Sequence, residues 1–166
     1  YLPAFNFRCL DHILQEGGRK VGIPYLPDRI AQLTKSHEGN PACHFCGACT
    51  TGCETGSFFS TPFRFLPPAE KTNNLELRTD ALAKNILVDE NGTASGVAYI
   101  DRRTGQEVEV RSRVVVVAAS CLESARIMLN SKSRIWPDGI ANSSGQLGRN
   151  LCDHLYGTSA DAYLPQ

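Results

Sequence analysis

Residues 114–120 read Val-Val-Val-Val-Ala-Ala-Ser, and this stretch decides the fold. A β-branched run without polar alternation is typical of a strand that is buried on both faces of a parallel sheet. Leu122, Ile127 and Met128 come next, and their spacing predicts a helix from about Leu122 to Asn130. A buried strand that leads into a helix is half of a nucleotide-binding βαβ unit, although any buried α/β strand fits the pattern equally well. The sequence therefore predicts an α/β fold.

The stretch before this run alternates apolar and polar residues with a period of two, which is typical of antiparallel strands. Asn91-Gly92 is the strongest hairpin signal, because both residues tolerate a positive φ angle, and Thr104-Gly105 predicts a second turn. We expect a small antiparallel meander, which makes this part of the chain α+β. Its expected strand segments are Leu75–Thr79, Ala83–Val88, Ala94–Asp101 and Val108–Val110.

Near the start of the sequence, Phe7, Leu10 and Leu14 recur at spacings of three and four residues. This spacing predicts a helix over Asn6–Gln15 that is closed by Gly17-Gly18. Prolines at positions 24, 27 and 41 then predict loop or extended backbone up to the cysteine-rich segment.

The charge balance excludes some classes of partner. The chain has 166 residues with 17 basic and 17 acidic side chains, so its formal net charge is zero. It lacks the electrostatic attraction on which binding to nucleic acids or anionic membranes depends. The longest apolar stretch is well short of the roughly 20 residues of a membrane-spanning helix. We expect no nucleic-acid partner and no membrane span in this chain.

The length fits one domain rather than several. The sequence begins with Tyr1, which is no initiator methionine, and stops at Gln166 without a closing element. We expect residues 1–166 to form a single incomplete domain, an internal fragment of a longer protein. Targeting signals would then lie elsewhere, and localisation stays open between periplasm and cytoplasm.

Four cysteines lie within the cysteine-cluster loop, residues 43–53, in the pattern C-x2-C-x2-C-x3-C: Cys43, Cys46, Cys49 and Cys53. This spacing matches bacterial ferredoxin runs and predicts an iron-sulfur cluster, although Glu54 stands where those runs have proline. A structural zinc usually takes two cysteine pairs that are farther apart, and thiol or disulfide chemistry is a third interpretation. A small iron-sulfur electron-transfer protein and a zinc-stabilised binding module are therefore alternative functions.

The order of these features resembles the glucose-methanol-choline (GMC) oxidoreductases, which are FAD enzymes. The resemblance covers about Ala42 to His154. It rests on the meander, the strand that ends in two alanines and a small residue, and Glu123-Ser124-Ala125-Arg126 in the next helix. It also rests on residues 142–154, which read Asn-Ser-Ser-Gly-Gln-Leu-Gly-Arg-Asn-Leu-Cys-Asp-His. The resemblance implies part of an FAD fold with two dinucleotide-binding segments.

By this resemblance, seven residues would contact or cover FAD. Ala83 would lie where the backbone meets the adenine, and Ala118, Ala119 and Ser120 would form the turn beside the adenosine. Ser120 departs from the usual glycine. The loop that closes over the cofactor would supply Asn150, Asp153 and His154, for which capping residues and a surface histidine are the alternative interpretations.

Family members with a cysteine-rich segment before the meander are the flavoprotein subunits of gluconate, fructose and glucose dehydrogenases, and this chain resembles them. The resemblance implies FAD-dependent oxidation of CH–OH groups of a sugar, sugar acid or other alcohol. The four cysteines would relay electrons to a cytochrome or other acceptor protein. No residue is assigned as the catalytic base, which the resemblance places beyond Gln166. The fragment alone is expected to be inactive, and the substrate, the cluster type and the oligomeric state stay open.

Overall fold

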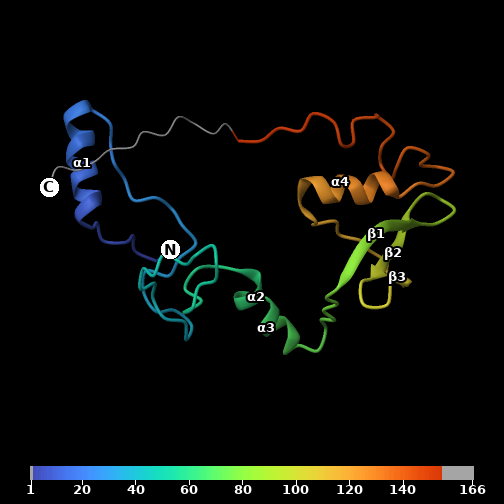
Figure 1. The fold of residues 1–166 in the computed structure, drawn as a ribbon, viewed down its shortest axis with the longest axis horizontal. Coiled ribbons are helices and arrows are strands. Elements are labelled where there is room, and N and C mark those ends of the chain that lie inside the picture. Colours follow the sequence, from blue (N-terminus) through green and yellow to red (C-terminus); the bar gives the residue numbers. More distant parts are fainter. Residues whose placement is uncertain (1, 155–166) are drawn as a thin grey trace. The chain divides into compact units, whose positions relative to one another are not determined.

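The structure of the protein is a computed structural model that describes residues 2–154. Its contacts group into two compact units, Tyr1–Leu77 and Arg78–Gln166. The first unit contains helices and loops, whereas the second contains a sheet with a helix beside it (Figure 1). The mixture of helices and strands confirms the predicted fold class. Among the described residues, no helix combines the length and apolar character that crossing a membrane requires.

The first unit begins with α1 (Cys9–Val21) and ends with two short helices, α2 (Thr61–Arg64) and α3 (Leu66–Glu70). The predicted first helix is confirmed, but its predicted end was wrong, because α1 continues through Gly17-Gly18. Gly22 closes it instead, with a left-handed φ of 73° and an N–H that donates to a carbonyl one turn back. No residue of α1 is buried.

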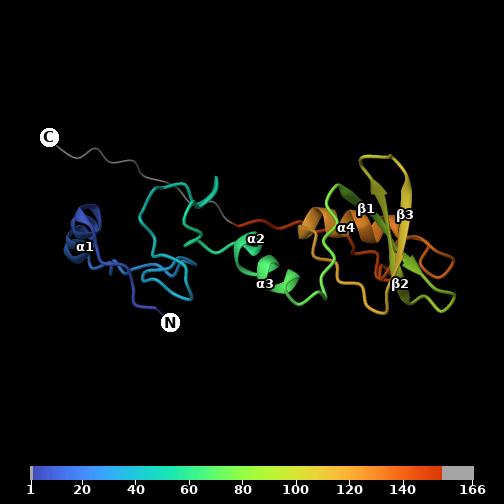
Figure 2. The same ribbon diagram turned by 90° about the horizontal axis from the view of Figure 1, so that it is seen from below.

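The second unit is built on an antiparallel three-stranded sheet in the order β1-β2-β3 (Figure 2). Its strands are β1 (Ala81–Val88), β2 (Ala94–Asp101) and β3 (Glu107–Arg111). They confirm the predicted meander. Leu75–Thr79, also predicted as a strand, has no regular secondary structure, because no described strand pairs with it.

The turn between β1 and β2 forms where the sequence predicts it. Gly92 has a φ of 84°, a conformation that a glycine adopts without strain. The carboxylate of Asp89 accepts hydrogen bonds from the N–H groups of Asn91 at 2.9 Å and Thr93 at 2.8 Å. These bonds fix the backbone of the turn and so the register of the two strands.

Helix α4 (Ser120–Asn130) packs against β1, and Figure 1 shows the two elements side by side. It confirms the predicted helix and begins two residues earlier than expected. The core of this unit includes Ile86 on β1, Ala98 on β2 and Ile127 on α4, whose exposed fractions are 5%, 1% and 6%. Burial of these side chains holds the helix on the sheet.

The run Val114–Ala119 corrects the prediction of a buried parallel strand. It has no regular secondary structure, and Val114 and Val116 are 74% and 81% exposed. A parallel strand needs a neighbouring strand to accept and donate its backbone hydrogen bonds. Within residues 2–154 no other segment pairs with this run, so Val114 and Val116 stay in solvent while Val115 and Val117 are half-buried.

Candidate functional site

Ala83, the predicted adenine contact, lies half-buried near the start of β1. The pairing of β1 with β2 shifts register between Ala83 and Asn85, so the strand is irregular at Lys84. The carbonyl oxygen of Ala83 accepts a hydrogen bond of 2.8 Å from Nη2 of Arg126 on α4. The backbone of Ala83 is therefore held by the neighbouring helix as well as by the sheet.

Arg126 is itself held by Glu123, one turn earlier on α4. Its Nε donates to Oε2 of Glu123 at 2.8 Å. This hydrogen bond lowers the pKa of Glu123 and raises the pKa of Arg126, so both groups stay charged over a wide pH range. The guanidinium group thus bridges a carboxylate on its own helix and a carbonyl on β1.

Ala118 and Ala119 directly precede α4, and Ser120 is its first residue, so the predicted turn lies at the start of this helix; its contact with adenosine stays a prediction. The backbone N–H of Ala119 donates to the hydroxyl oxygen of Ser124 at 3.2 Å. Ser120 has a φ of 64°, in the left-handed region that favours glycine. Glycine, which the family resemblance leads us to expect at position 120, would adopt this conformation without the strain that a Cβ atom adds. Because α4 packs on β1, the structure places this turn and Ala83 on two elements in direct contact.

The three residues of the predicted closing loop are exposed. Asn150 has a φ of 58°, and its Nδ2 donates to Oε1 of Gln146 at 3.0 Å. The N–H of His154 donates to the carboxylate of Asp153 at 2.7 Å. Within the described part of the chain, no hydrogen bond or ion pair joins these residues to Ala83 or to the turn before α4. Their role at the cofactor stays a prediction.

Three of the four clustered cysteines accept hydrogen bonds, each from a different donor. The N–H of Phe45, which has a φ of 63°, donates to Sγ of Cys43 at 3.3 Å. Nε2 of Gln32 donates to Sγ of Cys49 at 3.0 Å. Cys46 is exposed.

Cys53 is buried, with an exposed fraction of 8%. The hydroxyl groups of Ser57 and Thr55 each lie 3.5 Å from its sulfur, and the N–H of Phe58 donates to it at 3.5 Å. These hydrogen bonds, that of Ser57 first, lower the pKa of the Cys53 thiol from 9.0 to about 6. The Cys53 thiol therefore loses its proton at a lower pH than an ordinary cysteine does.

The structure does not gather these cysteines into a metal centre. Across residues 2–154, no three side chains of Cys, His, Asp or Glu lie close enough to hold one ion. The sulfurs of Cys43, Cys49 and Cys53 each accept a hydrogen bond from a different residue. The donor chemistry suits thiolate ligands, because N–H groups that point at sulfur stabilise the charged form. The geometry does not suit a metal site, because no three cysteines within residues 2–154 lie close enough together to hold one ion.

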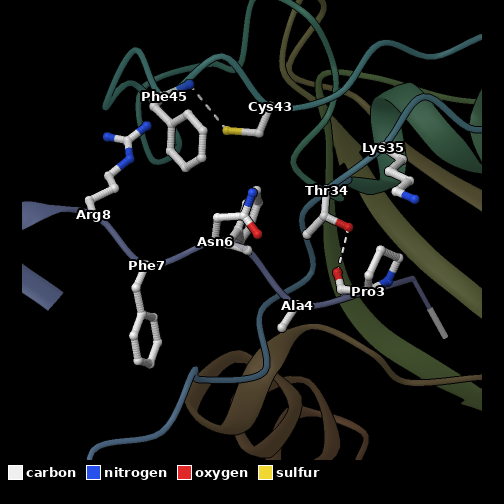
Figure 3. A pocket seen from close by; sticks show the side chains of 10 residues that line it. Pro3, Ala4, Asn6, Phe7, Arg8, Thr34, Lys35, Cys43 and Phe45 are labelled. Carbon is white, nitrogen blue, oxygen red and sulfur yellow. Dashed lines mark hydrogen bonds between the residues drawn. The ribbon is translucent and has the colours of Figure 1, made fainter. Parts of the chain in front are cut away.

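A depression of about 560 Å³ lies beside Cys43 in the first unit (Figure 3). The guanidinium of Arg8 stacks on the ring of Phe45, 3.3 Å from its centroid, and Phe5 meets that ring edge-on. Lys35 adds a second positive charge to the lining. The depression therefore combines cations with aromatic rings, but only one of the predicted metal ligands faces it.

Sequence reasoning missed the role of Arg126. The segment Glu123–Arg126 carried part of the family resemblance, and its acidic and basic ends stand three residues apart, a spacing that predicts an ion pair on one helix face. The bond from Arg126 to Ala83 joins residues 43 positions apart, and no sequence pattern signals it.

Comparison with known proteins shows that the chain is similar to oxidases and dehydrogenases, which are oxidoreductases. The chain is 34% identical over 161 residues to the 6'''-hydroxyparomomycin C oxidase of Streptomyces lividus, an alignment that covers 94% of this chain and 30% of that protein. It is 37% identical over 135 residues to the 2-methyl-1,2-propanediol dehydrogenase of Mycolicibacterium austroafricanum, covering 81% and 24%. It is 26% identical over 144 residues to the fructose dehydrogenase large subunit of Gluconobacter japonicus, covering 87% and 26%.

The family follows from a more extensive match. A family model described as GMC oxidoreductase matches residues 5–156, nearly the whole chain. The chain therefore belongs to the GMC oxidoreductase family, and the matched region is the FAD-binding domain of that family. The chain spans 24–30% of the length of the three relatives named above.

Proposed function

We propose that the chain is the FAD-binding part of an enzyme that oxidises CH–OH groups of a sugar, sugar acid or other alcohol. The family match over residues 5–156 carries this proposal. The names of the three relatives support an alcohol or sugar as substrate, because they give 6'''-hydroxyparomomycin C, 2-methyl-1,2-propanediol and fructose as the compounds acted on. Each of these compounds bears hydroxyl groups. A family match of this extent favours an enzyme over a small electron carrier or a zinc-stabilised module.

In this proposal the chain's own residues form the adenosine end of the cofactor site. The backbone of Ala83 and the small side chains of Ala118 and Ala119 would contact adenosine, the first from β1 and the others from the start of α4. The closing loop around Asn150, Asp153 and His154 would cover the cofactor from the other side. Bound FAD would supply the hydride acceptor for alcohol oxidation. All 166 residues would belong to one incomplete domain.

The test uses the longer protein that carries this chain. After purification, the flavin released on denaturation would be identified as FAD and quantified against protein. Sugars, sugar acids and simple alcohols would then be added without oxygen, and bleaching of the flavin absorbance would report reduction. We expect stoichiometric FAD and reduction by at least one alcohol, while deoxygenated analogues leave the flavin oxidised. A purified protein that neither contains nor takes up FAD would contradict the proposal.

An iron-sulfur relay is a second component of the proposal, and the spacing of Cys43, Cys46, Cys49 and Cys53 favours it. The N–H donors at the sulfurs of Cys43, Cys49 and Cys53 favour it as well. The separation of the thiols in this structure opposes it, so no electron-transfer step is derived through a cluster. The cluster would pass electrons to a cytochrome or other acceptor protein.

Cys49→Ser tests this relay in the longer protein, with Cys121→Ser, an exposed cysteine outside the loop, as the matched control. We expect Cys49→Ser to lose iron, to keep FAD and to keep activity with a small soluble dye. Transfer to the acceptor protein should fail, whereas the Cys121→Ser variant should behave as the unmodified protein. Unmodified protein without iron, or joint loss of iron and flavin, would show that the cysteines serve another purpose.

A further inference from the structure

Strand β1 has an outer edge that no other strand covers within residues 2–154. This strand lies at one edge of the sheet, so its outward-facing backbone groups need partners other than β2. Two side chains from the α4 region supply them. Arg126 donates to the carbonyl of Ala83 at 2.8 Å, and Ser131 accepts from the N–H of Ile86 at 2.7 Å.

The two hydrogen bonds from the α4 region occur in the same order along the strand as along the chain that follows it. Ala83 precedes Ile86 on β1, and their partners follow one another in the same order, Arg126 on α4 and Ser131 directly after it. The helix and the strand therefore run side by side in the same direction. The beginning of α4, with its Ala119–Ser120 turn, lies toward the beginning of β1, the end on which Ala83 stands.

Arg126 carries a planar guanidinium group, whose several N–H donors can serve two acceptors at once. The planar guanidinium of Arg126 uses Nε for Glu123 and Nη2 for both Glu123 and Ala83, and its side chain is 35% exposed. Glu123 fixes the plane of the group, and the fixed plane aims one N–H at the Ala83 carbonyl. A lysine has a single charged nitrogen on a flexible stem and cannot hold both acceptors with the same geometry.

Resting on the proposed FAD function, we propose that Arg126 is a positioning residue for the adenosine end of the cofactor. It touches none of the reacting atoms. It sets the distance between the Ala83 peptide and the turn at Ala119–Ser120, the two surfaces between which adenosine would lie. Because Arg126 acts on the adenosine end alone, its loss should weaken binding of FAD more than binding of FMN, which lacks the adenosine.

The experiment compares Arg126→Met and Arg126→Lys in the longer protein after removal of the flavin. Arg111→Met is the matched control, since Arg111 forms an ion pair with Glu109 on β3 and has no bond to β1 or α4. Dissociation constants for FAD and for FMN would be measured by flavin fluorescence, and the flavin absorbance would be recorded at saturation. The kcat at saturating FAD would be measured in parallel.

We expect Arg126→Met to raise the FAD dissociation constant by about tenfold or more, the loss that a removed charged hydrogen bond produces. The FMN constant and kcat at saturating FAD should not change, Arg126→Lys should recover part of the loss, and Arg111→Met should match the unmodified protein. Equal weakening of FAD and FMN, or an unchanged FAD constant in both Arg126 variants, would overturn the inference. An unmodified protein that binds no FAD would overturn the proposed function instead.

Discussion

The backbone N–H of Ile86 and the hydroxyl oxygen of Ser131 lie 2.7 Å apart and form a hydrogen bond between the edge strand β1 and the residue after α4. The same hydroxyl donates to the carbonyl oxygen of Ile127 at 2.6 Å. Ser131 is completely buried. One small side chain therefore satisfies a backbone donor on the strand and a backbone acceptor on the helix, both out of reach of water.

Ser131→Ala should destabilise the protein by about 2 kcal/mol, because it leaves the buried N–H of Ile86 without a partner. Denaturant unfolding followed by circular dichroism would measure the change. The control is Ser112→Ala, an exposed serine whose hydroxyl bonds a nearby carbonyl and whose loss should cost little. Equal stability of the two variants would show that the Ser131 hydroxyl does not join β1 to α4.

Ser120→Gly should stabilise the protein by about 1 kcal/mol, since Ser120 has a φ of 64° and glycine avoids the left-handed strain. Ala125→Gly in the same helix is the opposing control. Ala125 sits inside α4, so glycine there should lower the free energy of unfolding by about 1 kcal/mol. Thermal unfolding of both variants checks the signs, and a destabilised Ser120→Gly protein would contradict the strain argument.

The Cys53 thiol should make stability depend on pH in the iron-free protein. Its pKa is lowered from 9.0 to about 6 in the folded state, chiefly by Ser57, so folded protein releases this proton before unfolded protein does. The free energy of unfolding should therefore rise with pH between about 6 and 9.0 and lose this contribution as pH falls through 6.

Denaturant unfolding across that pH window would measure the effect, with Cys53→Ala as the reference in which the Cys53 contribution is absent. Alkylation of Cys53, followed by peptide mass mapping, should reach half its maximal rate near pH 6. Half-maximal alkylation close to pH 9.0, or identical pH profiles for the protein and Cys53→Ala, would contradict the hydrogen-bonded thiolate.

Ala119→Leu should weaken FAD retention in the longer protein, because a larger side chain at the turn would collide with the adenosine. Overpacking of this kind costs about 1–3 kcal/mol, which corresponds to a dissociation constant raised by about fivefold to somewhat over a hundredfold. Flavin content after gel filtration would measure it. Leu122→Ala, an exposed position later in the same helix, is the control. Wild-type FAD retention by Ala119→Leu would remove this turn from the cofactor site.

Local patterns predicted the meander and both long helices, because their signals lie within a few residues of one another. The Asn91-Gly92 turn is one example: the carboxylate of Asp89 and the positive φ of Gly92 act within the turn itself, and the longer-range bond from Trp136 to the Gly92 carbonyl adds to them. The end of α1 could not be predicted as well, because Gly17-Gly18 and Gly22 are all plausible stops and only the helix hydrogen bonds select Gly22.

Features that depend on distant partners could not be predicted from the sequence. The bond between Arg126 and Ala83 depends on how α4 packs on β1. The spacing of the four cysteines predicts a common centre, yet the sulfur of Cys49 is bonded by Gln32, which lies 17 residues away and belongs to no cysteine motif. Spacing limits which ligands can meet, but the folded loop decides whether they do.

The exposed run Val114–Ala119 has a consequence for handling the protein. Four consecutive valines without a proline and without a paired strand in residues 2–154, two of them largely exposed, form the kind of segment that pairs with identical copies of itself. Arg113 precedes the run, and like charges on two copies repel each other at low salt. The protein should therefore remain dispersed in dilute, low-salt buffer, and it should form intermolecular β-structure as protein and salt concentrations rise.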